Sequence, residues 1–367
     1  MDNDKKDLMD NDKKEFSSKD IFWYKHKNKI IAGGATIAIA LIAAGAIFFI
    51  STMNNGNTQD DTEFVGDEQR IADYLITPTK DKVILSIAEK EQSESSYTYK
   101  NVDELDTNDK TIYSNSNDLD SLYAFDKTTK KISQYKVDNA KLAKNDVADY
   151  KGDVTDFKSF KYHDNVFAGY SNGYITVQYK DKVEVIKVDG DVANYLIKDN
   201  RVLYAIKNKL YAYNVETKKT QSVDLEKDIQ DIELINNQVV AMSKFGETNK
   251  TSTIASFKVA DLYATGLTTV NYTDTVALQN SDENVDFYVF SKDNQKNGIT
   301  TVTISDEILK VEKTGGTFDA ITEQDVGRNG YAYLIKNNKI SVIDINSGIE
   351  AGLLNIDDAL LVAPVFY

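Results

Sequence analysis

The chain has 367 residues, a formal net charge of −15 at pH 7, only two histidines and no cysteine. Without cysteine it can form neither disulfides nor thiolate metal sites, and two histidines leave little for histidine-based metal or triad chemistry. The acidic residues are spread along the chain, which is typical of a soluble surface and argues against nucleic acid, whose phosphates need a basic stripe.

The first 29 residues are polar and are predicted to form a partly disordered cytoplasmic segment. The octamer MDNDKKDL at 1–8 is followed at once by MDNDKKEF at 9–16, and a tandem repeat this polar cannot bury a core. A second start at Met9 is the simplest explanation of this duplication.

Residues 30–50, IIAGGATIAIALIAAGAIFFI, carry no charge and predict a single transmembrane helix. At 1.5 Å per residue this length crosses a bilayer core of about 30 Å. Three lysines within 25–29 precede the span and acidic residues follow it, so the N-terminus is expected in the cytoplasm and the rest outside. A cleaved signal peptide is the alternative, but its apolar region would usually be about 7–15 residues long. Thr36, Ala40 and Ala44 form a small-residue ridge through which two such helices could pair as a homodimer.

After a linker at 51–70, residues 71–367 read as short alternating strands with polar turns, which predicts an all-β domain. A two-residue polar pair precedes most repeats of a unit made of strand, tight turn, strand and polar turn. The second positions of these pairs are spaced 35, 37, 47 and 45 residues apart: Asn165, Asn200, Asn237, Asn284 and Asn329. A four-stranded unit of about 40–45 residues is a β-propeller blade, and roughly 300 residues predict about seven blades, with six or eight possible. A sandwich or barrel would explain the alternation but not the recurrent unit.

Two near copies of one decamer lie 88 residues apart, LYAFDKTTKK at 122–131 and LYAYNVETKK at 210–219. We expect this distance to be two blades, with each copy forming the third strand of its blade and the following turn.

The chain ends on the apolar segment ALLVAPVFY at 359–367, which needs a sheet to join. We expect it to pair with a blade begun by the N-terminal strands near 83–88 and so to close the ring. Pro78 and Pro364 both fall near this seam, and proline is tolerated in strands only at edges and ends.

The turn after the repeated strand reads AFDKTTK at 124–130, AYNVETK at 212–218 and VIDINSG at 342–348. This resembles a degenerate form of the quinoprotein-like (PQQ-like) β-propeller repeat, whose blades carry Ala-x-Asp-x-x-Thr-Gly and then a docking tryptophan. Lysine replaces the glycine in two copies, and the only tryptophan is Trp23. The resemblance implies either quinone enzymes that oxidise alcohols or envelope scaffolds with no cofactor. Because the tryptophans of the quinone site are missing, the scaffold type is expected, with no cofactor and no metal.

The polar segment 89–120 is either a long insertion or part of a blade. As an insertion it would share one face of the propeller with the loops at 244–252 and 291–298, and long loops on a rigid scaffold are where binding tends to reside. Its aromatic residues are then the predicted partner-binding residues, because exposed tyrosine is enriched at interfaces: Tyr97, Tyr99 and Tyr113. In the alternative, these tyrosines belong to the core of an ordinary blade.

Two other places in the sequence contain residues that could form a site. His163 lies at the end of an expected inner strand and is interpreted as a hydrogen-bonded turn residue. Asp189 and Asp191 flank Gly190 and could bind a hard cation, but a lone turn between strands usually only reverses the chain.

The sequence therefore predicts a single-pass membrane protein whose propeller lies outside the cell membrane, in a lysine- and asparagine-rich chain that suits a Gram-positive envelope. The expected function is a protein-interaction scaffold for envelope or membrane proteins, and not an enzyme. A ligand-sensing ectodomain that signals through the helix is the first alternative, and a wall-polysaccharide lyase or hydrolase is the second. Clustered carboxylates in the central funnel would favour an enzyme, whereas a pocketless disc with an apolar patch would favour the scaffold.

Overall fold

The computed structural model describes residues 70–90, 96–235, 237–244, 252–270, 274–277, 286–293, 296–305, 308–317 and 325–367. No helix within these residues is long and apolar enough to span a membrane, and the span predicted at 30–50 lies outside them.

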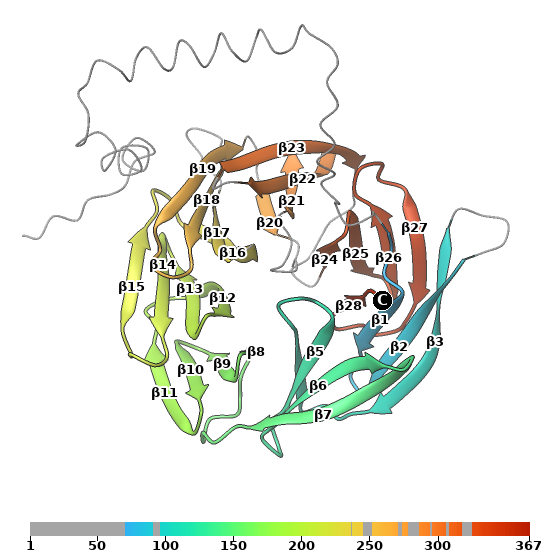
Figure 1. Cartoon of the computed structure of the whole chain (residues 1–367), viewed down its shortest axis with the longest axis horizontal. Helices are drawn as coiled ribbons and strands as arrows, with labels where there is room; N and C mark the ends of the chain where they lie inside the picture. The colour runs from blue at the N-terminus through green and yellow to red at the C-terminus, as the bar shows by residue number, and fades with distance from the viewer. Residues whose placement is uncertain are drawn as a thin grey trace, which may run out of the picture.

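All described elements are β-strands, and they form seven four-stranded antiparallel units arranged in a ring, as in a β-propeller (Figure 1). The first four blades contain these strands, from the innermost outwards: blade 1, β28 (Ala363–Val365), β1 (Tyr74–Pro78), β2 (Lys82–Lys90) and β3 (Tyr97–Asp106); blade 2, β4 (Thr111–Asn115), β5 (Ser121–Asp126), β6 (Lys131–Asp138) and β7 (Lys141–Asp149); blade 3, β8 (Ser159–His163), β9 (Val166–Ser171), β10 (Tyr174–Tyr179) and β11 (Lys182–Lys187); blade 4, β12 (Val192–Lys198), β13 (Arg201–Ile206), β14 (Lys209–Asn214) and β15 (Thr220–Asp224).

The other three blades continue this order: blade 5, β16 (Ile229–Ile235), β17 (Gln238–Ser243), β18 (Ser252–Lys258) and β19 (Ala264–Val270); blade 6, β20 (Asp274–Ala277), β21 (Asp286–Asp293), β22 (Lys296–Ser305) and β23 (Ile308–Thr317); blade 7, β24 (Val326–Arg328), β25 (Tyr331–Lys336), β26 (Lys339–Asp344) and β27 (Glu350–Asn355). The first strand of each blade lies nearest the axis of the ring (Figure 1). The expected all-β fold of four-stranded repeats is confirmed, and seven is the number of blades among the described residues.

The strand order divides the connections between two faces of the ring. Turns between first and second strands, and between third and fourth strands, open on one face, which we call the turn face. Turns between second and third strands open on the opposite face, together with the links from blade to blade, and we call it the link face. Each innermost strand therefore starts at the link face and ends at the turn face.

The predicted polar pairs are the tight turns between first and second strands. Asp164 and Asn165 have φ angles of 49° and 61°, and Asp199 and Asn200 have angles of 50° and 55°. Two consecutive residues in the left-handed region suit the twist of a β-hairpin, and Asn and Asp enter that region most readily after glycine. These two pairs therefore mark the same turn in successive blades, as the spacing predicted. The last predicted pair is displaced by one residue, because Arg328 ends β24 and Asn329 and Gly330 form the turn, with φ angles of 50° and 79°. The pair containing Asn284 lies outside the described residues.

The repeated decamer does not mark equivalent strands. The copy at 210–219 begins in β14, the third strand of blade 4, as predicted, but the copy at 122–131 begins in β5, the second strand of blade 2. The two segments share their turn chemistry. Asp126 accepts hydrogen bonds from the backbone N–H groups two and three residues later at 2.8 and 3.1 Å, and Asn214 does so at 3.1 and 2.8 Å. The expectation that both copies are third strands is therefore wrong, because the repeat encodes a turn and this turn occurs on either face.

The same turn explains the lysine that replaces glycine in the repeat. Lys130 and Lys218 each have a φ of 59°, and Gly348 occupies the corresponding position with a φ of 71°. A non-glycine residue tolerates this conformation at some cost, since glycine has no Cβ to strain it.

The two ends of the described chain close the ring, as the sequence predicted. The C-terminal strand β28 pairs antiparallel with β1, and β1 pairs with β2. Pro364 lies opposite Leu75 in the innermost strand of blade 1. This strand has a neighbour on one side only, and proline, which lacks an N–H group, is tolerated in such an edge strand. The terminal residue adds contacts: the backbone N–H of Tyr367 donates to Asp73 Oδ2 at 2.7 Å and its hydroxyl donates to the carbonyl of Val137 at 2.8 Å.

A second join between the first and last blades was not predicted. The outermost strands β27 and β3 pair in parallel at Gly352 with Tyr97 and at Leu353 with Thr98, which unites blades 7 and 1 into one eight-stranded sheet. A side chain at Gly352 would lie 3.3 Å from the Tyr99 ring, so a residue without a Cβ suits this approach.

The core consists of apolar layers between neighbouring blades. The layer between blades 2 and 3 is largely aromatic and contains these buried residues: Phe125, Ile132, Tyr150, Phe157, Phe160, Tyr162 and Phe167. Alternate residues of β8 therefore face this layer, and the residues between them face the other side of the blade.

Candidate functional site

A cavity of about 520 Å³ lies at the centre of the ring, against the innermost strands of blades 2 to 5. Its walls come from β4, β8, β12 and β16, and Leu360 and Leu361, just ahead of β28, complete it. The residues from β8, β12 and β16 belong mostly to the first halves of those strands, so the cavity lies towards the link face. A volume of this size falls in the range of small-molecule sites, about 300–1,000 Å³.

Four charged residues line this cavity: Lys158, just ahead of β8, and three residues on the innermost strands of two non-adjacent blades. Lys161 is the middle residue of β8, and Asp231 and Glu233 lie on β16. Glu233 is only 6% exposed. Burial lowers the pKa of the Lys161 ammonium below its ordinary value, and the charges of Glu233 and Asp231 oppose this shift without cancelling it. A buried charge of this kind is expensive unless it is paired, so perturbed groups in a cavity indicate a functional site.

Hydrogen bonds between neighbouring blades hold the carboxylate of Asp231. Asn194 on β12 donates through Nδ2 to Asp231 Oδ1 at 2.9 Å and to the Ile232 carbonyl at 3.1 Å. The Asn194 Oδ1 atom accepts a hydrogen bond from the backbone N–H of Tyr195 at 2.8 Å. Asn194 is therefore oriented at both ends of its amide, and it fixes Asp231 in turn.

Register irregularities lie where these residues enter the cavity. The pairing of β12 with β13 shifts between Val192 and Tyr195, and the pairing of β16 with β17 shifts between Ile229 and Asp231. Bulges of this kind redirect side chains and are frequent beside functional sites. Here two of them adjoin the cavity on neighbouring blades.

Tyrosine and serine hydroxyl groups complete the polar lining. The hydroxyls of Ser159 and Tyr195 are hydrogen-bonded at 3.0 Å, and burial raises the pKa of Tyr195, so that it remains a neutral phenol. Tyr113 on β4 donates to Thr107 Oγ1 at 2.8 Å, and burial raises its pKa to about 12. The site therefore offers neutral donors and acceptors around two amines, Lys158 and Lys161, and two carboxyl groups.

The segment 89–120 belongs to two blades instead of forming an insertion, because β3 and β4 account for most of it. Tyr99 is 3% exposed and donates to the Ala72 carbonyl at 2.7 Å, and Tyr97 is half-buried against the core of blades 7 and 1. Tyr113 instead lines the central cavity. The expectation of three exposed tyrosines on one loop is therefore wrong for Tyr99, because the blade ladder places it in the core; partner binding by the three stays a prediction.

The predicted grouping of long loops on one face also changes. Since β2 and β3 are the third and fourth strands of blade 1, their connection belongs to the turn face, whereas those after β17 and β21 belong to the link face. These connections include residues outside the described part of the chain.

None of the four charged residues of the cavity was predicted as a site residue from the sequence. One signal was available: in IQDIELI at 229–235, Asp231 and Glu233 are charged residues within a strand whose other residues, apart from Gln230, are apolar. A charge in the middle of a buried strand needs compensation, but the sequence does not reveal that Lys161, 72 positions before Glu233, lines the same cavity.

His163, Asp189 and Asp191, the other candidate residues from the sequence, do not line the cavity. His163 ends β8, as expected, and its Nε2 atom is 3.2 Å from Asp164 Oδ2 in the following turn. Asp189 and Asp191 are exposed in the link between β11 and β12. In the described part of the chain, no cluster of three or more acidic, histidine or cysteine residues could hold a metal ion.

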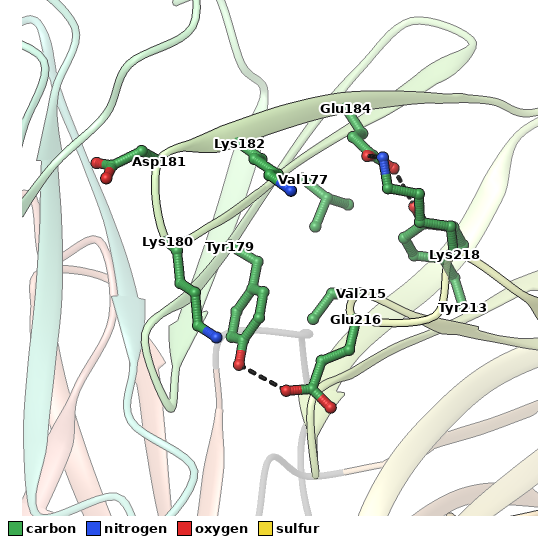
Figure 2. Close-up of a pocket in the computed structure, with 10 residues that line it drawn as sticks. All are labelled: Val177, Tyr179, Lys180, Asp181, Lys182, Glu184, Tyr213, Val215, Glu216 and Lys218. Atoms are coloured by element: carbon green, nitrogen blue, oxygen red, sulfur yellow. Dashed lines mark hydrogen bonds and ion pairs between the residues drawn. The ribbon is translucent and has the colours of Figure 1, made fainter.

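A second hollow of about 310 Å³ lies between blades 3 and 4, at the turns that connect their third and fourth strands (Figure 2). Tyr179 donates to Glu216 Oε1 at 2.8 Å, and Glu184 accepts a hydrogen bond from Tyr213 and pairs with Lys218. All of these contacts cross from blade 3 to blade 4, so they join the two blades. We interpret this hollow as a structural seam and the central cavity as the candidate site.

Comparison with known proteins supports the fold. No family model and no curated protein matches the chain. Among solved structures, a Bacteroides uniformis protein provisionally named a 6-phosphogluconolactonase is similar, with a TM-score of 0.55, 11% identity and coverage of 80% of this chain and 99% of that one. A functionally unknown Desulfotomaculum acetoxidans protein has a TM-score of 0.51, 11% identity and the same coverage. A Bacteroides fragilis protein with the same provisional name has a TM-score of 0.49, 14% identity and coverage of 84% and 99%.

At these identities the likeness concerns the fold alone. It nevertheless corrects one expectation, that the chain is not an enzyme. The fold that pointed to a scaffold is shared with a protein that bears an enzyme name, so the propeller gives no ground for excluding catalysis.

Proposed function

We propose that this chain is a membrane-anchored, extracytoplasmic β-propeller whose central cavity binds a small polyhydroxylated molecule such as a sugar or a sugar acid. The observation that supports this most directly is the convergence of Lys161, Asp231 and Glu233 on a cavity of about 520 Å³. Carboxyl and amide groups can bond the neighbouring hydroxyls of a sugar in pairs, and an amine can bond a ring oxygen or an acidic group.

The remaining lining fits the same class of ligand. Asn194 supplies an oriented amide, Ser159 and Tyr195 supply hydroxyls, and Ile112 and Leu361 supply apolar surface for the C–H groups of a sugar ring. A mostly preformed pocket with a few convergent polar groups is the usual form of a small-molecule site. Clustered carboxylates in the centre of the ring also favour a ligand-handling protein over a pocketless scaffold.

The strand order supports an orientation of the cavity relative to the proposed anchor. The described chain enters the ring at Arg70, ahead of β1, whose N-terminal end lies at the turn face. An anchor at 30–50 would therefore join the propeller on the turn face. The cavity lies towards the link face, on the side away from that junction, where solutes outside the membrane could reach it.

The binding proposal is tested by thermal unfolding of the full-length chain in detergent with neutral sugars, aldonic acids and amino sugars. A ligand at 100 times its dissociation constant should stabilise the protein by about 2.7 kcal/mol. We expect one class to raise the melting temperature of the wild type and of Glu184→Gln, a matched carboxyl change in the seam, but not of Glu233→Gln. If no class raises it, or if Glu233→Gln responds as the wild type does, the cavity is not the binding site.

Hydrolysis of a sugar lactone is a second candidate function. The buried Glu233 carboxyl beside the Lys161 amine could act as a general base for a water molecule that attacks the ring carbonyl. The fold shared with the provisionally named lactonase agrees with this chemistry. Acid release from gluconolactone and 6-phosphogluconolactone, followed in a pH-stat, tests it. A rate that is the same with the wild type, with Glu233→Gln and without protein would reject it.

The kinship with the quinoprotein-like repeat and the recruitment of envelope proteins also stand as proposals. Recruitment of a partner would use the outer surface of the ring, which does not line the cavity. Cross-linking in intact cells, followed by identification of the captured proteins, tests the recruitment. Capture of no envelope protein above the level of an unrelated anchored domain would argue against it.

A further inference from the structure

We propose that Lys161 is a nucleophilic amine that forms an imine with an aldehyde or ketone in the central cavity, such as the open-chain form of a reducing sugar. This inference rests on the proposed function of the cavity and narrows its ligand class. It goes beyond binding because it assigns a covalent step to one atom, Lys161 Nζ.

The position of Lys161 directs its side chain away from the aromatic layer. Its neighbours in β8, Phe160 and Tyr162, are 1% and 8% exposed and pack between blades 2 and 3. Because side chains alternate along a strand, Lys161 faces the other side of the blade, where Ser159 meets Tyr195 and the carboxyl groups of blade 5 converge.

The surroundings favour the free amine over the ammonium ion. Removal from water is the dominant influence on Lys161 and lowers its pKa, while the two carboxylates of β16 act in the opposite sense. Lysine shifts its pKa readily when buried, and a desolvated lysine is the usual form of an imine-forming nucleophile. Glu233, itself buried, is a suitable acceptor for the proton that Lys161 loses.

The proposed step balances without an oxidant or a reductant. The Nζ lone pair of Lys161 attacks the carbonyl carbon, a C–N bond forms, and the carbonyl electron pair moves to oxygen. Transfer of one proton from the positively charged nitrogen to this oxygen gives a neutral carbinolamine, while Glu233 holds the proton that it took from the ammonium ion. Glu233 then returns a proton to the hydroxyl group, the C–O bond breaks, and one water molecule leaves as the C=N bond forms. In this proposal the phenol of Tyr195, which remains protonated and is hydrogen-bonded to Ser159, donates to the developing oxyanion.

The experiment is reductive trapping on the full-length chain in detergent at pH 7. Glycolaldehyde, which is small enough for the cavity, is added with sodium cyanoborohydride, and the two-carbon adduct at each lysine is followed by peptide mass spectrometry. Lys180, exposed on the seam between blades 3 and 4, is the internal comparator. Each unit by which the pKa of an amine is lowered raises its unprotonated fraction about tenfold at this pH. Because burial lowers the pKa of Lys161, we expect this residue to label faster than Lys180.

Rates on the wild type decide the question even if a variant fails to fold. Labelling of Lys161 no faster than that of Lys180 overturns the imine proposal. A saturating excess of a ligand found in the thermal assay should suppress labelling at Lys161 but not at Lys180. Sugar-dependent stabilisation without fast labelling would leave the binding function standing and remove the imine. Fast labelling without any stabilising sugar would keep the reactive amine and remove the polyhydroxylated ligand.

Discussion

Removal of β28 should open the ring and abolish cooperative unfolding. A chain that ends at Leu361 loses Val362 and Ala363, which are both 0% exposed, and Val365, which is 4% exposed. Burial of a valine side chain contributes about 1.5–3 kcal/mol, so the two valines alone account for roughly 3–6 kcal/mol. Each lost hydrogen bond of the terminal Tyr367 adds about 0.5–1.5 kcal/mol.

This loss is comparable with the whole stability of a typical protein, about 5–15 kcal/mol. The truncation also leaves β1 without its inner neighbour and exposes the apolar face of blade 1. Residues 70–367 and residues 70–361 would be compared by urea unfolding and by calorimetry. Tyr367→Phe is the control, since it keeps β28 and removes only the hydroxyl that bonds Val137, with an expected cost of about 1 kcal/mol.

We expect the control to melt cooperatively a few degrees lower and the truncated ring to aggregate or to unfold without a sharp transition. A truncated protein with an unchanged midpoint and slope would refute the reasoning. It would mean that β27 and β3, the parallel join, hold the ring closed without the C-terminal strand.

Three further predictions concern Tyr99, Glu184 and the membrane topology. Tyr99→Ser should destabilise the protein by about 3–5 kcal/mol and lower its urea midpoint, because it empties a buried ring position; an unchanged midpoint would contradict this. Glu184→Gln should cost about 1 kcal/mol at pH 7. The hydrogen bond from Lys218, and next that from Tyr213, lower the pKa of the Glu184 carboxyl. The contribution of that carboxylate is therefore complete above about pH 5 and disappears as the pH falls through the lowered pKa, so the variant and the wild type should converge in acid; a constant difference down to pH 2 would contradict this. Protease added to wall-stripped protoplasts should digest the propeller and leave residues 1–29 protected; protection of the propeller would reject the proposed topology.

The features that the sequence predicted well are those decided within a few residues. Alternation along a strand depends on neighbours two positions apart, and the pairs such as Asp164 and Asn165 form tight turns because their own side chains tolerate the left-handed conformation. Ring closure by 359–367 was also predictable, because an apolar terminal strand must find a sheet. These are local or compositional requirements, and they are visible in a single chain.

The position of a repeated segment within its blade could not be predicted from local sequence, as the decamer shows. The turn after Asp126 and the turn after Asn214 use the same hydrogen bonds, yet one follows a second strand and the other a third. A turn is stabilised by its own four or five residues, so the same turn sequence can form at different places in a blade. The place is decided by how many strands precede it in that sheet, and in blade 2 the polar run that looked like an insertion supplies only one, β4.

The candidate site depended on the tertiary structure almost entirely. Lys161, Asn194 and Glu233 come from three successive blades and meet only because the innermost strands of a ring converge on its axis. Bulges in β12 and β16 then adjust which side chains enter the cavity. The sequence by itself determined the strands, their turns and the apolar segment proposed as an anchor, because short-range sterics and hydrophobicity decide these. The ring alone decided which charges meet in a site screened from water, because their attraction and their desolvation depend on distances between residues far apart in the chain.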